Sequence, residues 1–253
     1  MKRAFCMLLA AIFCAAALFP VSAYAADYEP GDTDMRISVD DTSWYVFTRD
    51  NILNNAELEE LGITYEAMYD ILHNNEAYMD AILLYEDGEY VELFVRKRAL
   101  DSGIANLSNY ENEEVLELAK ELAKKYGAEE YSVYEGQYKF TRLEYFDSNY
   151  GYYICEYVTV VNRDNYTLTF QTPSPFTDWE YDEIQRIVDS IRFDVDATIR
   201  EEKPASFLDG IVVKTITGAV IGGIVGLGIA LAGKKKKQRK NDSPAPADTA
   251  EKD

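Results

Sequence analysis

The sequence predicts an α+β fold, in which an antiparallel sheet is layered with helices, followed by one C-terminal transmembrane helix. Three observations predict it. Strand-like segments follow one another over 131–171, amphipathic helices flank them at 113–126 and 178–191, and an uncharged apolar run occupies 215–232. The folded part is then a single extracytoplasmic domain, 35–194, which is long enough to bury a core of its own.

The N-terminus has the pattern of a signal peptide, 1–25. Lys2 and Arg3 supply the positive start, 5–18 is the apolar segment, and Ala23 and Ala25 are the small residues that precede a cleavage site. An acidic lead follows at 26–34. We expect this lead to be unstructured and solvated. The alternative is a calcium-binding loop, since calcium prefers oxygen ligands, although the spacing is not that of an EF-hand.

The first half of the domain predicts two hairpins and two short helices. In MRISVDDTSWYVF, apolar residues alternate and Asp40-Asp41 is expected to turn the chain into a small hairpin. Asn55 is expected to cap a helix that stops at Gly62, and Thr64 a second one. In AILLYEDGEYVELFV, Asp87-Gly88 predicts a two-residue turn with positive φ at both positions.

The second half predicts a long helix, four strands and a closing helix. Asn112 is expected to cap the helix 113–126, which Gly127 ends. The strands are YSVYE, QYKFTRLEYF, YYICEYVTVV and YTLTFQT, with a turn at 162–165 before the last. Thr177 and Glu180 form the pattern of a capping box for the helix 178–191.

This order of elements resembles the PsbP/Mog1-like α/β/α sandwich. The residues that carry the resemblance are the tryptophan-containing early strand SWYVF, the strand YTLTFQTP and the closing helix that ends in IVDSIRF. The resemblance covers about 35–193. It implies that this domain of a secreted, membrane-anchored bacterial protein serves as an accessory or binding subunit. It assigns no functional residue, because no position matches a catalytic or binding motif, and a fold alone does not fix function.

The C-terminal part predicts a membrane anchor. A stalk, 195–210, leads to the transmembrane helix, 211–233, and a basic tail, 234–253, follows with Lys234–Lys237 in a row. Because basic clusters stay on the cytoplasmic side, the domain is expected outside the cell membrane and the tail inside. Gly218, Gly222 and Gly226 lie on one face of this helix. They predict self-association or a partner helix; the alternative is that glycine is simply frequent in spanning helices.

Composition excludes several function classes. The formal net charge is −20, so we expect no binding to nucleic acid or to an anionic lipid surface. The acidic surface is expected either to attract cations, cationic peptides or a basic partner, or simply to keep the domain soluble. After signal removal Cys155 is the remaining cysteine, so no internal disulfide is expected, and its apolar strand predicts a buried, inert thiol. These features together suggest a bacterium with a single membrane.

The sequence contains no recognised catalytic motif and predicts no cofactor, metal or catalytic residue. The single histidine, His73, is expected at the surface near a helix end. The leading hypothesis is therefore a membrane-tethered binding or accessory module whose ligand is a protein, peptide or wall component. The alternatives are a hydrolase-type surface enzyme, such as a phosphatase, and a structural subunit of a membrane complex assembled through its transmembrane helix.

Tyrosine is frequent, with 20 in the chain, and one predicted hairpin is especially rich in it. A tyrosine ring offers a flat apolar face and a polar tip, which suit contacts with peptides or glycans. Tyrosine also has a high strand propensity, so ordinary sheet packing is the alternative. The candidate recognition residues are Tyr145, Tyr150, Tyr152, Tyr153 and Tyr157.

Overall fold

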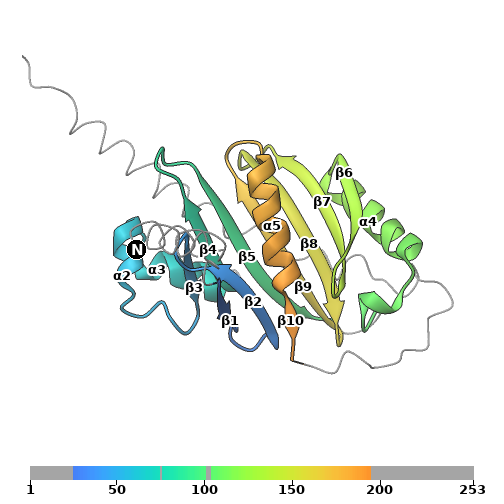
Figure 1. Ribbon diagram of the computed structural model, residues 1–253, viewed down its shortest axis with the longest axis horizontal. Coiled ribbons are helices and arrows are strands. Elements are labelled where there is room, and N and C mark those ends of the chain that lie inside the picture. The colour runs from blue at the N-terminus through green and yellow to red at the C-terminus, as the bar shows by residue number, and fades with distance from the viewer. Residues whose placement is uncertain (1–24, 75, 101–103, 195–253) are drawn as a thin grey trace, which may run out of the picture.

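The computed structural model describes residues 25–74, 76–100 and 104–194, and it is an α+β structure as predicted (Figure 1). Its main element is a seven-stranded antiparallel sheet in the order β3-β4-β5-β9-β8-β7-β6. Most strands pair with the strand that follows them in sequence. Strand β9 joins the two halves of the sheet, because it pairs with both β8 and β5. The strands are β3 (Trp44–Thr48), β4 (Ala77–Leu84), β5 (Tyr90–Ala99), β6 (Glu130–Glu135), β7 (Lys139–Asp147), β8 (Tyr152–Val161) and β9 (Asp164–Thr172).

A second sheet has three strands, β1 (Ala25–Tyr28), β2 (Met35–Asp40) and β10 (Arg192–Phe193), with β2 in the middle. Two expectations are wrong here. Part of the acidic lead is not unstructured, because β1 pairs with β2 along its whole length. The predicted hairpin across Asp40-Asp41 does not form either: the chain turns there, but β2 and β3 belong to different sheets.

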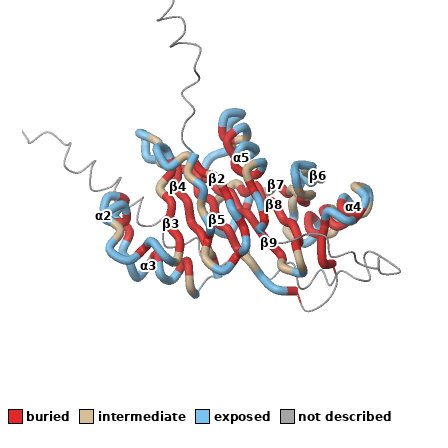
Figure 2. The backbone as a smooth tube through the Cα atoms, turned by 60° about the horizontal axis from the view of Figure 1, so that its bottom comes forward, coloured by how far each residue is buried: buried red, intermediate tan, exposed pale blue. Residues whose placement is uncertain are grey.

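One face of the large sheet is covered by the closing helix α5 (Asp178–Ser190) and by β2 (Figure 2). Ile184, Ile187 and Val188 of α5 pack against the sheet in the largest apolar cluster, which also contains Ile37 and Val39 of β2. The predicted capping box is confirmed: Thr177 Oγ1 accepts from the Glu180 N–H, and the Glu180 side chain accepts from the Thr177 N–H. This cap fixes where α5 begins relative to the strand before it.

The opposite face carries two separate apolar clusters. At the β3–β4 side, Phe47 and Phe94 pack with the short helices α2 (Ala56–Leu61) and α3 (Tyr65–Tyr69) and the π-helical turn η1 (Asp70–Asn74). At the β7–β8 side, Leu143 and Val158 pack with α4 (Asn112–Tyr126) and the short turn η2 (Leu107–Asn109). These two groups of helices and turns therefore cover the two margins of this face rather than its middle.

Local signals for the helix ends are mostly confirmed. Asn55 and Thr64 cap α2 and α3 through their side chains, and Gly62 and Gly127 end α2 and α4 in the left-handed region. The cap of α4 is Glu111 rather than Asn112, because Glu111 and Glu114 form a capping box there. In α3, Met68 is buried whereas Tyr65 and Tyr69 are exposed.

The β4–β5 hairpin forms as predicted, but its turn differs. Only Gly88 has a positive φ (85°), whereas both central positions of the expected turn require one. The Tyr85 N–H donates to the Glu89 carbonyl and the Gly88 N–H to the Tyr85 carbonyl, so the loop contains three residues. The tight turn with two positive φ values occurs instead between β8 and β9, at Asn162 (51°) and Arg163 (66°).

The signal peptide, the stalk, the transmembrane helix with Gly218, Gly222 and Gly226, and the basic tail lie outside the described residues. Within the described ranges, no helix has the length and apolar character needed to cross a membrane.

Candidate functional site

At one end of the large sheet, the segments that meet there contain no Lys or Arg. Because the sheet is antiparallel, β4, β7 and β9 end where β3, β5, β6 and β8 begin, and the first turn of α5 also lies there (Figure 1). Every segment that meets at this end carries Asp or Glu, and none carries Lys or Arg. We call it the cation-free end; its segments are 40–44, 84–90, 127–130, 146–153 and 172–182.

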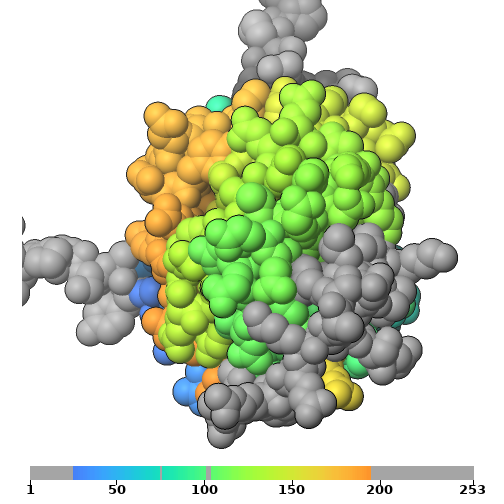
Figure 3. All heavy atoms as spheres, turned by 90° about the vertical axis from the view of Figure 1, so that its right-hand side faces the viewer, coloured from blue at the N-terminus to red at the C-terminus, as the bar shows by residue number. Residues whose placement is uncertain are grey.

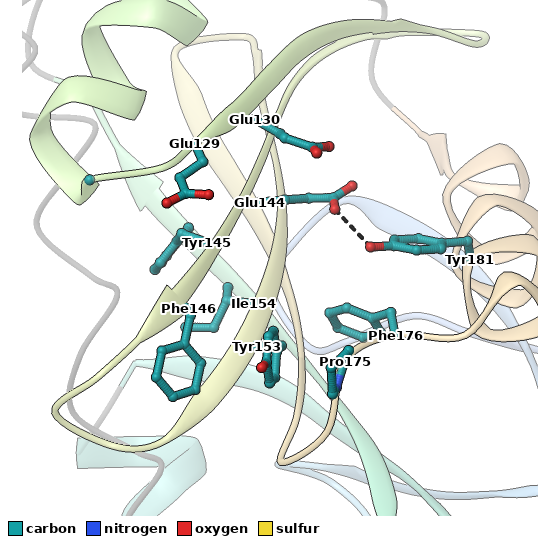
Figure 4. A pocket seen from close by; sticks show the side chains of 11 residues that line it. Glu129, Glu130, Glu144, Tyr145, Phe146, Tyr153, Ile154, Pro175, Phe176 and Tyr181 are labelled. Carbon is teal, nitrogen blue, oxygen red and sulfur yellow. Dashed lines mark hydrogen bonds between the residues drawn. The ribbon is translucent and has the colours of Figure 1, made fainter.

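A groove with a cavity volume of about 480 Å³ opens at this end, between the β7–β8 hairpin and the loop that leads into α5 (Figure 4). This volume lies in the range of sites for small ligands or single side chains. In the space-filling view from the side of β6 and α4, side chains of α5 border those of the edge strands (Figure 3). We call it the acidic–aromatic groove; its lining residues are Gly127, Glu129, Glu130, Glu144, Tyr145, Phe146, Tyr153, Ile154, Pro175, Phe176 and Tyr181.

Aromatic rings form one side of the groove. Phe146 on β7 and Tyr153 on β8 are cross-strand partners with ring centroids 4.9 Å apart. Phe176 and Tyr181 face them from the α5 side, with centroids 5.5 Å apart (Figure 4). Phe146 is 52% exposed, which is unusual for a large apolar side chain in a sheet. Exposed aromatic rings in a groove offer apolar contact area to a ligand at a low cost in side-chain entropy.

Carboxylates form the other side. Glu129 and Glu130 lie at the start of β6 and are exposed. Glu144 is fixed: it accepts a hydrogen bond of 2.7 Å from the Tyr181 hydroxyl and forms an ion pair with Arg142. Burial and this hydrogen bond raise the pKa of Tyr181, so its hydroxyl remains a donor at neutral pH. Glu144 thus positions the Tyr181 ring, and Glu129 and Glu130 supply the negative charge that faces solvent.

The structure divides the five candidate tyrosines between different environments. Tyr153 lines the groove, and Tyr150 lies in the adjacent turn with 36% exposure. Tyr157 is buried in the core under α5. Tyr145 lies mainly on the opposite face, where its ring stacks on Tyr126 at 5.8 Å. Tyr152 also lies on that face and shares a 2.6 Å hydrogen bond with the Tyr90 hydroxyl. The five therefore do not form one surface.

A second functional candidate is a buried polar stripe in the middle of the face opposite α5. It contains one arginine and three carboxylic acids, Arg96, Asp80, Glu92 and Glu156, none more than 2% exposed. The register brings them together: Glu92 lies opposite Gln171, and Thr169 lies between Phe94 and Glu156 on adjacent strands. The stripe separates the two apolar clusters of this face.

Few of these buried groups have hydrogen-bond partners in the part of the chain that the structure describes. Gln171 donates to Glu92 at 2.5 Å and Thr169 to Glu156 at 3.4 Å. Neither oxygen of Asp80 and none of the three guanidinium nitrogens of Arg96 has one. Buried polar atoms are normally satisfied, so each such exception calls for a physical explanation. The guanidinium lies over the Phe94 ring, 5.1 Å from its centroid.

Burial dominates the protonation of this stripe. It raises the pKa of Glu92 to about 8 and that of Glu156 to about 7, against the opposing effect of the Arg96 charge. It raises the pKa of Asp80 well above its usual range, and the nearby Glu92 charge adds to this shift. The stripe therefore holds protons at neutral pH that the same groups would release in an unfolded chain.

Sequence reasoning missed both the stripe and most of the groove. A signal for the stripe exists: YMDAILL, YVELFV and YICEYV each place one acid inside an otherwise apolar strand. An acid in an alternating strand is normally expected to face solvent. Here the helices at both margins of the sheet face help to bury that side of the strands. The groove residues Phe176 and Tyr181 gave no signal, because they lie about 30 residues from Phe146 in sequence.

The remaining candidates are placed as follows. Cys155 is buried, as predicted, and burial raises the pKa of its thiol to about 12. His73 lies in η1 at a helix end and stacks on Tyr69 with centroids 4.0 Å apart. Among the described residues, no group of three or more His, Cys, Asp or Glu is arranged to hold a metal ion.

Comparison with known proteins gives a loose similarity of fold. No protein-family model matches the sequence, and no curated protein matches it. The chain is similar to the solution structure of cyanobacterial PsbP (CyanoP) from Synechocystis sp. PCC 6803, with 11% identity, a TM-score of 0.39, and coverage of 68% of this chain and 93% of that one. A crystal structure from Bacteroides thetaiotaomicron is 9% identical, with a TM-score of 0.32, and covers 66% of this chain and 46% of its own.

The similarity to PsbP is one of fold and has low specificity. That agrees with the resemblance predicted from the order of elements. At this level of identity and superposition the similarity concerns the fold alone. Function is therefore inferred from the acidic–aromatic groove and the cation-free end.

Proposed function

We propose that this protein is a membrane-tethered, extracytoplasmic binding module that captures a basic segment of a partner protein or peptide in the acidic–aromatic groove. One observation carries the proposal. Aromatic rings and carboxylates line a groove of about 480 Å³ at an end of the sheet whose segments contain no Lys or Arg. A lysine or arginine side chain has the complementary chemistry.

The physical fit is specific to a cation with an apolar stem. The stem of Lys or Arg packs on aromatic rings while the charged group stays near water or a carboxylate. A cation over an exposed ring contributes about 0.5–1 kcal/mol, and more when water is excluded. Glu129 and Glu130 add Coulomb attraction that salt screens. An anionic ligand would instead meet the exposed carboxylates of Glu129 and Glu130.

The predicted anchor is consistent with this orientation. Helix α5 begins at the cation-free end and runs away from it for 13 residues, about 20 Å. The described chain ends after β10, where the Asp194 N–H donates to the Asp34 carbonyl. A stalk that continued from Asp194 would therefore start at the end of the domain opposite the groove. A membrane on that side would leave the groove facing outward.

The test is binding of a fluorescently labelled hexalysine peptide to the full-length protein in detergent micelles. We expect binding that weakens as salt rises. The double variant Glu129→Gln/Glu130→Gln should weaken it by about fivefold to tenfold, since each exposed charge contributes up to about 1 kcal/mol. A matched control, Glu66→Gln/Glu113→Gln, removes the same charge from exposed helix positions elsewhere. Equal losses in both variants would show that binding depends on the net charge of the protein and not on the groove.

The hydrolase and structural-subunit alternatives stay predictions from the sequence. They rest on no residue of the groove. Failure of hexalysine to bind at low salt would remove the proposal and leave those two readings to be tested by activity screening and by copurification of membrane partners.

A further inference from the structure

A second groove opens at the cation-free end, on the other side of α5. Its cavity volume is also about 480 Å³, and it lies where β3 begins and β4 ends. We call it the tryptophan groove; the residues that matter here are Asp41, Glu57, Tyr85 and Trp179. Its lining, like that of the first groove, contains no Lys or Arg.

The chemistry of the tryptophan groove repeats that of the acidic–aromatic groove. Trp179 is 54% exposed and meets the Tyr85 ring edge-on, with centroids 6.4 Å apart. The Tyr85 hydroxyl donates a 2.8 Å hydrogen bond to Glu180, which holds that ring in place. Burial and this bond raise the pKa of Tyr85, so the donor persists at neutral pH. Asp41 and Glu57 are exposed carboxylates at the same groove.

The first turn of α5 joins the two grooves. Trp179 lines one and Tyr181 lines the other. Residues two positions apart in an α-helix are separated by about 200° around the helix axis. The side chains of Trp179 and Tyr181 therefore point to opposite sides of α5. Between them, Glu180 caps the helix through Thr177 and is buried. The capped first turn of α5 thus presents two aromatic rings to two cavities of the same chemistry.

We infer that the two grooves form a two-point site for one basic polypeptide segment, which crosses the first turn of α5 and places one cationic side chain in each groove. The inference rests on the proposed function and specifies its partner as a peptide with at least two separated basic residues. Charge complementarity supports this occupant, because both linings are acidic and the segments between them lack cations. Linked binding at two sites also raises affinity without new contacts, through effective concentration.

The experiment compares two labelled peptides on the full-length protein in micelles. One carries a single lysine in a Gly/Ser chain, and the other carries two lysines separated by Gly/Ser spacers of varied length. At a spacer that spans the turn, the two-lysine peptide should bind at least tenfold more tightly than the one-lysine peptide. Shorter spacers should lose this gain, because the linker then cannot reach both grooves.

Variants separate the two grooves. Trp179→Ala, or Asp41→Asn/Glu57→Gln, should reduce binding of the two-lysine peptide to the level of the one-lysine peptide, and so should Glu129→Gln/Glu130→Gln. Glu66→Gln/Glu113→Gln again controls for net charge. Because Trp179, Asp41 and Glu57 are exposed, thermal unfolding should be nearly unchanged, which confirms that each variant is folded.

The outcomes distinguish the inference from the proposed function. If the two-lysine peptide has no advantage at any spacer, or if variants of the tryptophan groove bind it normally while Glu129→Gln/Glu130→Gln does not, the site has one point and the inference is overturned. If neither peptide binds at low salt, the proposed function fails with it. Tight binding that either groove's variants abolish supports both.

Discussion

Inside the sheet, the Gln171 side-chain amide donates a 2.5 Å hydrogen bond to the Glu92 carboxyl group on the neighbouring strand. Both residues are fully buried. The remaining groups of the stripe that face Glu92 are Asp80 and Arg96, with Glu156 beyond the strand that carries Thr169. A carboxyl group in such a place ionises only with difficulty, which links the stability of the domain to pH.

The first prediction concerns this linkage. The pKa values of Glu92 and Glu156 are raised, to about 8 and about 7, so the folded state holds protons that the unfolded state releases above about pH 4.5. Stability should therefore be highest at the acidic side of this window and fall as pH rises toward 8. The slope approaches about 1.4 kcal/mol per pH unit for each such proton. Urea unfolding between pH 5.5 and 8.5 measures it.

Glu92→Gln provides the control, because its amide is neutral at every pH. This variant should flatten the decline, and at pH 8 it should be at least as stable as the wild type. A decline of unchanged slope in Glu92→Gln would assign the linkage to other groups.

The second prediction concerns Arg96. Its charge is the only positive one that the structure places among Asp80, Glu92 and Glu156 in the described part of the chain. Arg96→Met keeps much of the volume but removes the compensation, and breaking a buried charge arrangement costs about 3–5 kcal/mol. The loss should be smaller at pH 5.5, where the carboxyl groups are neutral. Urea titrations of both proteins at pH 5.5 and pH 8 test this, and a loss independent of pH would contradict it.

The caps at Asn55, Thr64 and Thr177 were predictable because each depends on a few neighbouring residues. The pairing of β2 was not, because its alternating residues show that one side is buried but not which strand lies beside it. Met35 and Val39 of β2 are buried against α5, 150 residues later in the chain.

The candidate sites followed the same division. The tyrosine-rich hairpin was visible in the sequence, and Tyr153 does line the groove. Its companions Phe176 and Tyr181 come from another part of the chain, so the groove exists only after folding. The acids of the buried stripe were visible as letters, but their burial depends on helices that pack on both margins of the same sheet face.

The third prediction separates recognition from packing among the tyrosines. Tyr150 is 36% exposed, and Tyr157 is 3% exposed with its ring against Phe140 and Phe170. Tyr150→Ser should leave the melting temperature nearly unchanged. Tyr157→Ser should lower the free energy of unfolding by about 3–5 kcal/mol, as for the loss of a large buried aromatic side chain. Thermal unfolding followed by circular dichroism compares them, and similar losses in both variants would be contrary to the structure.

The last prediction concerns the transmembrane segment, which lies outside the described residues. Gly218, Gly222 and Gly226 are spaced by four in the sequence, so a helix would align them in a shallow strip without side chains. In lipid, apolar burial does not drive helices together, whereas close backbone contact across small residues does. We therefore expect the full-length protein to self-associate or to dock on a second membrane helix through this strip.

Crosslinking of the full-length protein in membranes tests this expectation. Gly222→Ile should abolish the crosslinked species, because a branched side chain in the middle of the strip keeps the backbones apart. Ile229→Leu exchanges one apolar side chain for another, three residues beyond Gly226, and should leave the crosslinked species intact. If the wild type and Gly222→Ile crosslink equally, the strip is not an interface and the segment serves only as an anchor. In that case the two-point site would act from a single copy of the domain, and peptide affinity should not depend on protein density in the membrane.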